Sequence, residues 1–205
     1  MNLIRNIIRK NKIKVKIIFN FFKWVYKIVF TQKNNAGFCI INMHIKLLNK
    51  NLYFKHYKVK CAVGKRGISS KKREGDRKTP RGTFRIKHVF YRKDRIKKLK
   101  TEFKKKIIKK NMGWCDDPSS PHYNKLIKFP FKFGAERLYL KKKIYDVVLV
   151  LNYNTRNVVK NAGSAIFIHL ATSTYKPTEG CVAISRKDMF LLLKNLRIKN
   201  KFTIY

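Results

Sequence analysis

The sequence predicts a mainly β domain with one or two helices, preceded by a basic segment. Two observations carry this prediction: short apolar stretches with strand spacing recur between residue 40 and the C-terminus, and one stretch near the end has helical spacing. The 205 residues suit one domain with an appendage, and 44% hydrophobic residues suffice for a core. We therefore expect a leader over residues 1–39 and a folded domain over 40–205.

The first 38 residues differ from the rest of the chain, because they carry nine Lys and Arg residues and no acid. Residues 17–30 are apolar and aromatic but are interrupted by Lys23 and Lys27. A basic start followed by an apolar stretch is typical of a signal peptide or membrane anchor. An amphipathic helix on an anionic membrane surface and a disordered basic leader are the alternatives. No apolar run is long enough for a polytopic membrane protein.

The formal net charge is +41, from 51 Lys and Arg against 10 Asp and Glu. Lysine is spread over every kind of segment, whereas a nucleic-acid interface concentrates basic residues on one element. We therefore expect no specific nucleic-acid partner, although a basic surface favours any polyanion, including a bacterial envelope. All ten acids lie at or after Glu74, so the acidic islands are informative exceptions.

The four cysteines, Cys39, Cys61, Cys115 and Cys181, are widely spaced and form no CxxC pair. This spacing supports neither a zinc site nor a disulfide framework, and we expect no metal and no cofactor. Cys61 lies in an alternating stretch and is expected to be a small buried apolar residue.

The predicted elements follow in chain order. Residues 43–48, the turn 49–51 and residues 52–64 form a hairpin, and residues 64–82 form a loop. Residues 83–91 form a strand, residues 94–110 a polar surface excursion and residues 111–124 a loop rich in turn formers. Residues 144–154 and 164–171 contain continuous apolar runs, which are typical of strands buried on both faces.

After Cys181 the pattern becomes helical. Ser185 and Asp188 have capping-box spacing, and the apolar residues that follow share one broad face. Residues 202–205 close the domain as a short strand.

The strongest chemical signal lies in residues 164–185. His169 ends a buried strand, and Cys181 follows a turn and precedes the capped helix by a few residues. A thiol at a helix N-terminus loses its proton more easily, and a nearby histidine can take that proton. Gly180 permits close backbone approach, and the amides around Cys181 are candidates for an oxyanion hole. By themselves such pairs are more often structural than catalytic, and further metal ligands are not placed.

This segment resembles the active-site motif of the YkuD-type L,D-transpeptidases, in which a histidine is followed by a loop and S/T-x-G-C. Here the matching residues are His169, Thr178, Gly180 and Cys181. Residues 73–84, REGDRKTPRGTF, are similar to the family's D-G-x-T-P-x-G-x-F segment. WCDDP, YN and YDVVLVLNYN are similar to a subgroup with a TEGC motif. The resemblance covers roughly residues 41–205.

The resemblance implies a β-sandwich or barrel-like catalytic domain and a cysteine acyl-transferase acting on peptidoglycan stem peptides in cell-wall biogenesis. Cys181 is then the nucleophile and His169 the base; a terminal D-amino acid leaves, and an amine resolves the thioester. The implied location is the periplasm or cell envelope, with residues 1–38 a possible membrane contact. An L,D-carboxypeptidase and a non-enzymatic basic protein that binds an anionic polymer are the alternatives.

The chain departs from the family's usual S-H-G-C motif, because Glu179 occupies the histidine position. Ala183 also replaces an arginine that is common two residues after the cysteine. Two roles are open for Glu179, orienting His169 or facing solvent. Two are also open for Thr178, a hydrogen bond within the site or formation of the turn.

Five further residues are weaker candidates for substrate binding. Asp116 and Asp117 either contact a stem-peptide amine or shape their loop, since Asp-Pro favours turns. Trp114 either walls the cleft or is buried in the core. Tyr175 lies in the short loop before Cys181 and is expected to shape its opening, and Asp76 is expected to organise a turn rather than to catalyse.

Overall fold

The computed structural model describes residues 43–69 and 73–205, which belong to one compact unit, Asn42–Tyr205. The leader predicted for residues 1–39, with Cys39, lies outside the described residues and stays a prediction. In the described part, no helix is both long and apolar enough to span a membrane.

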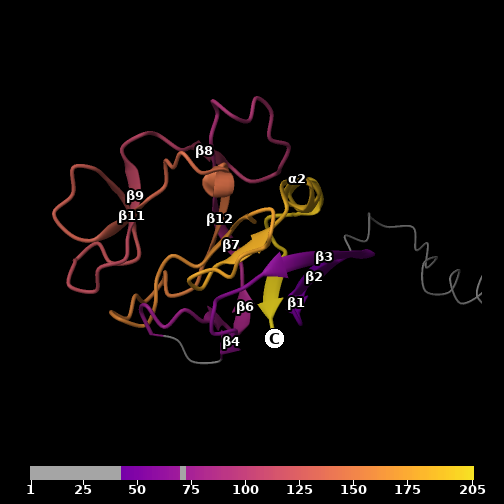
Figure 1. Cartoon of the computed structure of the whole chain (residues 1–205), viewed down its shortest axis with the longest axis horizontal. Helices are drawn as coiled ribbons and strands as arrows, with labels where there is room; N and C mark the ends of the chain where they lie inside the picture. Colours follow the sequence, from indigo (N-terminus) through magenta and orange to yellow (C-terminus); the bar gives the residue numbers. More distant parts are fainter. Residues whose placement is uncertain (1–42, 70–72) are drawn as a thin grey trace, which may run out of the picture. The chain divides into compact units, whose positions relative to one another are not determined.

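Most of the regular structure is β, which confirms the predicted fold class (Figure 1). The strands of the large sheet are β1 (His44–Leu48), β2 (Asn51–Phe54), β3 (Tyr57–Ala62), β6 (Gly82–Phe84), β7 (Ile86–Tyr91), β8 (Lys105–Ile107), β12 (Val147–Leu151), β13 (Phe167–Leu170), β14 (Val182–Ile184) and β15 (Lys201–Ile204). The smaller sheets are formed by β9 (Met112–Cys115), β10 (Leu126–Lys128) and β11 (Ala135–Arg137), and by β4 (Ile68–Ser69) and β5 (Thr79–Pro80). A 3-10 helix, η1 (Lys143–Tyr145), and the α-helix α2 (Arg186–Asn195) complete the described part.

The large sheet is curled. Its ten strands run in the order β6-β15-β1-β2-β3-β14-β13-β12-β7-β8. β6 ends at Phe84 and β7 begins at Ile86, yet the two strands lie near opposite ends of that order. Because one residue separates them along the chain, the two ends of the sheet approach each other there. The predicted single strand over residues 83–91 is therefore two strands with different partners.

The predicted hairpin at the start of the domain is a three-stranded meander. Asn49 and Lys50 both have positive φ (48° and 58°) and connect β1 to β2, which fits a hairpin turn. The stretch predicted as one strand, residues 52–64, reverses at Lys55, whose φ is 51°. The stretch alternates only in part, and the adjacent polar residues Lys55 and His56 are the one break in its pattern at the reversal.

The strands predicted to be buried on both faces are confirmed: every residue of β12 and β13 is buried. One face, with Leu149 and Ile168, joins the larger core beneath α2. The other face, with Val148, Val150 and Phe167, joins a second core. The helix begins as expected, because Ser185 Oγ accepts from the Asp188 amide at 3.1 Å and donates to its carboxylate at 2.6 Å.

The segment predicted as a loop and the one predicted as a polar surface excursion both contain strands. β9 lies within residues 111–124, and all of its residues are buried. β8 lies within residues 94–110, where Ile96, Leu99 and Phe103 are also buried. The buried apolar residues in these segments are few and are surrounded by lysines and turn formers, so a pattern-based prediction misses them.

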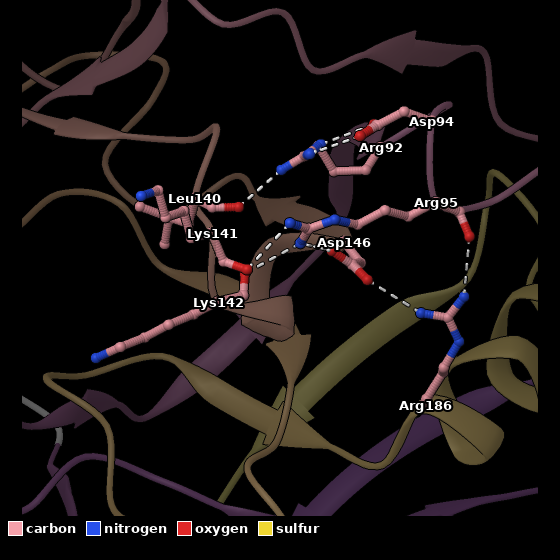
Figure 2. A network of polar contacts seen from close by, with 8 residues as sticks. All are labelled: Arg92, Asp94, Arg95, Leu140, Lys141, Lys142, Asp146 and Arg186. Carbon is pink, nitrogen blue, oxygen red and sulfur yellow. Dashed lines mark hydrogen bonds and ion pairs between the residues drawn. The ribbon is translucent and has the colours of Figure 1, made fainter.

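A network of arginines and aspartates holds the start of β12 (Figure 2). Asp146 is 1% exposed and accepts from Arg95 at 2.8 Å and from Arg186, the first residue of α2, at 3.1 Å. Nearby, Arg92 donates two hydrogen bonds to Asp94. The buried carboxylate thereby joins three segments that are distant in sequence.

Replacing Asp146 by asparagine is expected to lower the free energy of unfolding by about 2 kcal/mol, because the negative charge and one of the two charge-assisted hydrogen bonds are lost from a buried site, where an amide NH2 then faces an arginine. Urea denaturation measures this change. Glu102→Gln is the matched control, since it breaks an exposed ion pair with Arg197, and its effect should be much smaller. Equal effects of the two substitutions would contradict this account of the network.

Candidate active site

The register of β13 and β14 places the candidate thiol and imidazole on one face of the sheet. Ile168 pairs with Val182, and His169 pairs with Ala183. Extending this parallel register back by one residue places Cys181 opposite Phe167. Alternate side chains of a strand share a face, and paired residues of neighbouring strands do too. His169 and Cys181 therefore project to the same side of adjacent strands, although a loop separates them in sequence.

The Cys181 sulfur is held by two backbone groups at the edge of β13. Its Sγ donates to the Ala165 carbonyl oxygen at 3.1 Å, and the Phe167 N–H donates to Sγ at 3.3 Å. The first of these bonds requires the thiol proton, whereas the second can be made to the thiol or to the thiolate. The expected position at a helix N-terminus is wrong, because β14 follows Cys181 and α2 begins only at Arg186.

His169 is a buried base. The side chain is 7% exposed, and its Nδ1 lies 3.0 Å from the Leu170 carbonyl oxygen, which only a protonated Nδ1 can satisfy. Nε2 is then the nitrogen that can accept a proton. Burial lowers the pKa of His169 to about 4, against the opposing effect of the Leu170 hydrogen bond. The imidazole is therefore neutral at pH 7.

Tyr145, which is buried, and Glu136, which is half-buried, form a hydrogen-bonded pair beside His169 that the sequence did not single out. The Tyr145 ring packs edge-on against His169, with ring centroids 5.2 Å apart. Its hydroxyl donates to Glu136 Oε1 at 2.5 Å. Burial, followed by the charges of Cys181 and Glu136, raises the pKa of Tyr145. The only sequence signals were the YDVV segment for Tyr145 and the rarity of acids for Glu136.

The loop before Cys181 is a hydrogen-bonded turn. Thr178 Oγ1 donates to the Cys181 carbonyl oxygen at 2.6 Å and accepts from the Gly180 N–H at 3.2 Å. Gly180 has a φ of 142°, which favours glycine. Thr178 thus has the turn-forming role, and the Gly180 N–H is engaged in the turn.

Thr79 fastens this turn from a distant segment, and the sequence analysis gave it no role in the site. It is fully buried; its Oγ1 donates to the Gly180 carbonyl oxygen at 2.9 Å and accepts from the Gly64 N–H at 2.9 Å. The signal was present, because Thr79 belongs to the T-P segment that resembles the family.

Thr79→Val is expected to lower the free energy of unfolding by about 2 kcal/mol, because a buried donor and acceptor lose their partner. Movement of the turn should also slow modification of Cys181 by iodoacetamide. Denaturation curves and alkylation rates measure the two effects. Thr83→Val removes a hydroxyl that bonds Thr203 instead, and should leave alkylation unchanged. Equal alkylation in both variants would contradict the role of Thr79.

Of its two expected roles, Glu179 takes the solvent-facing one. Its carboxylate forms ion pairs with Lys65 at 2.6 Å and with Arg77 at 3.1 Å, and the side chain is 66% exposed. Tyr175 lies in a hollow on the other side of the loop, where the Lys60 ammonium sits 4.9 Å from its ring centroid.

Two of the weaker candidates have structural contacts. Trp114 is buried at 3% exposure, and its Nε1 donates to Asn124 at 2.9 Å, so it belongs to the core. The Asp117 carboxylate accepts from the N–H and hydroxyl of Ser119 and from the Gly134 N–H, which shapes the loop.

Asp76 accepts from the N–H groups of Arg73 and Lys78, which makes it a turn organiser. Asp116 is half-buried and lines the cavity of the site.

Cys181 and His169 line one cavity of about 700 Å³. Four acids also line it: Glu74, Asp116, Glu136 and Glu179. Further lining residues include Tyr145, Ser164, Ala165, Thr178, Gly180, Arg77 and Lys176. Within residues 43–69 and 73–205, no group of three His, Cys, Asp or Glu residues is arranged to hold a metal ion.

A curled β-sheet that presents a thiol and a buried imidazole to one cavity defines a class of β domains with a candidate cysteine–histidine active site. Residues 41–204 match the model of the YkuD family, the L,D-transpeptidase catalytic domain, and the chain belongs to this family. This membership confirms the resemblance seen in the sequence.

Other comparisons add little. The solved structure of Bd1075 from Bdellovibrio bacteriovorus is similar at 13% identity and a TM-score of 0.44, over 80% of this chain and 48% of that one. The chain thus spans about half of that structure's length. No curated protein matches the chain.

Proposed function

We propose that the protein is a cysteine acyl-transferase that acts on peptidoglycan stem peptides, with Cys181 as nucleophile and His169 as general base. The observation that carries this proposal is the register of β13 and β14, which sets both side chains on one face beside one cavity. Because the substrate class is extracytoplasmic, the protein would act in the cell envelope.

The reaction begins when the Cys181 thiol transfers its proton to His169 Nε2 and attacks the carbonyl carbon before the terminal D-amino acid. The C–N bond breaks as the protonated imidazole returns the proton to the leaving amine, and a thioester remains. An amine from a second stem then attacks the thioester, which forms a new amide and restores the thiol. Water in place of the amine gives a trimmed stem.

The burial of His169 supports this sequence of steps. A histidine with a pKa of about 4 is unprotonated at neutral pH, so its Nε2 is open to accept the thiol proton, and the same lowered pKa makes it a weaker base than an exposed histidine. The Nδ1 hydrogen bond to Leu170 fixes the ring and its tautomer, as the orienting group does in other nucleophile–base pairs.

Intact-protein mass spectrometry after mixing the protein with a disaccharide-tetrapeptide tests the proposal. We expect a mass increase equal to the stem without its terminal residue, and peptide mapping should locate it on Cys181. Supplying an amine acceptor should convert the adduct to cross-linked product, whereas trimmed stem alone would indicate hydrolysis. A folded protein with reduced Cys181 that yields neither adduct nor product would refute the proposal.

A further inference from the structure

Three carboxylates in the site cavity stand out against the charge of the molecule. Among residues 43–69 and 73–205, no Lys or Arg lies within ion-pair distance of Glu74, Asp116 or Glu136, although the molecule as a whole is strongly basic. The fourth acid of the cavity, Glu179, is neutralised by Lys65 and Arg77. We call Glu74, Asp116 and Glu136 the acidic wall.

We propose that the acidic wall binds a primary ammonium group of the substrate. This inference rests on the proposed function and names the chemistry that the same cavity selects. It makes the three carboxylates specificity-determining groups for an amine-bearing stem peptide.

The carboxylates are close enough for their negative charges to repel one another. Burial, followed by the charges of Glu74 and Asp117, raises the pKa of Asp116, and burial together with the charge of Asp116 raises the pKa of Glu136. Adjacent like charges without a counter-ion are unfavourable, and a bound cation would relieve this.

Two members of the wall are held in place by phenol groups. The Tyr145 hydroxyl donates to Glu136 Oε1, and the Tyr123 hydroxyl donates to Glu74 Oε2, both at 2.5 Å. The Tyr123 oxygen in turn accepts from the Gly163 N–H at 3.0 Å. Fixed carboxylates bind a ligand without a further ordering cost.

A separate observation points to a ligand in the same cavity. Ser164 lines it and is 5% exposed, and its Oγ makes no hydrogen bond of normal geometry in the described part of the chain, although it lies near enough to the Tyr123 hydroxyl to lower the pKa of that phenol. A buried hydroxyl without a partner is costly. An ammonium group has three donors and no acceptor, which suits carboxylates together with a hydroxyl oxygen.

The other candidate cation, a metal ion, does not suit this geometry, because the carboxylates do not converge as a ligand set within the described residues. The positive groups of the cavity do not oppose the proposal. Arg77 is engaged by Glu179, and Lys176 is exposed on the loop before the turn.

Thiol-specific reagents of different charge test the wall without any enzymatic turnover. We expect a trimethylammonium-ethyl methanethiosulfonate to modify Cys181 roughly tenfold faster than a neutral methanethiosulfonate, and a sulfonate reagent to be slowest. The net charge of the whole molecule predicts the reverse order. Asp116→Asn and Glu136→Gln should each bring the cation-to-neutral ratio toward one, and Glu102→Gln, at a remote ion pair, should leave it unchanged.

A faster sulfonate reagent, or a cation preference that survives both substitutions in folded variants, would overturn the proposal. Because this assay needs only a reactive thiol, its result is independent of whether the protein acylates stem peptides.

Kinetics with two substrates then identify which amine is bound. If the donor stem supplies the ammonium, acetylating its side-chain amine should raise KM roughly tenfold, and Asp116→Asn should remove that difference. If the acceptor supplies it, Asp116→Asn should raise KM for the acceptor while thioester formation stays unchanged. A KM that moves in neither case would also overturn the proposal.

Discussion

Replacing Cys181 by alanine is expected to abolish the thioester adduct and to reduce release of the terminal D-amino acid by at least about 10⁴-fold, because no other group can form the covalent intermediate. The measurements are intact mass and amino-acid release with the disaccharide-tetrapeptide. The fold should persist, since alanine is smaller than cysteine and the neighbouring strands β13 and β14 keep their backbone pairing.

Cys61→Ala is the matched control for this substitution. Cys61 is 2% exposed in β3, and burial raises the pKa of its thiol to about 12, so it is not a nucleophile at neutral pH. Its replacement should cost stability but leave acylation intact. An adduct on Cys61 or Cys115 in the Cys181→Ala protein would assign the chemistry to another thiol and refute the proposed mechanism.

Local sequence patterns were enough to predict the strands whose residues are all buried. They were also enough to predict the helix cap, whose two residues are close in sequence. The apolar run of β12, and that of β13 with His169 as its one polar residue, are typical of strands buried on both faces. The Ser185–Asp188 pair closes its cap within three residues, so its spacing alone identifies it. His169 and Cys181 were found because both belong to one short motif.

The remainder of the site depends on contacts between distant segments, which local patterns do not contain. Thr79 reaches Gly180 across 101 residues, and Glu136 acquires its role only through Tyr145. The segment after Cys181 was misassigned for a different reason. A short apolar run fits a strand or a helix equally well, and pairing with β3 and β13 decides for β14.

The buried histidine should also govern how stability depends on pH. The folded-state pKa of His169 is about 4, whereas an unperturbed histidine has a pKa near 6.5, so the unfolded chain binds the proton more tightly. Stability is therefore highest above pH 6.5 and falls as the pH drops from 6.5 toward 4. The expected loss between pH 7 and pH 4.5 is on the order of 2 to 3 kcal/mol.

Urea denaturation at these two pH values measures this loss. His169→Gln should reduce it by most of that amount, whereas His122→Gln, at an exposed histidine, should leave it unchanged. An unaltered pH dependence in the His169→Gln protein would mean that the imidazole is not buried in its neutral form.

The same substitution also tests the catalytic role of His169, apart from its effect on stability. His169→Gln is expected to slow thioester formation by about 10²- to 10⁴-fold at pH 7, because the thiol loses its proton acceptor. In the wild type, a base with a pKa of about 4 should stay active through pH 5.5, where an exposed histidine would already be largely protonated. The pH profile of acylation by the disaccharide-tetrapeptide measures this limb. An acylation rate that falls with a midpoint near pH 6.5 as the pH is lowered would exclude His169 as the base that serves Cys181. A His169→Gln rate close to that of the wild type would exclude it too.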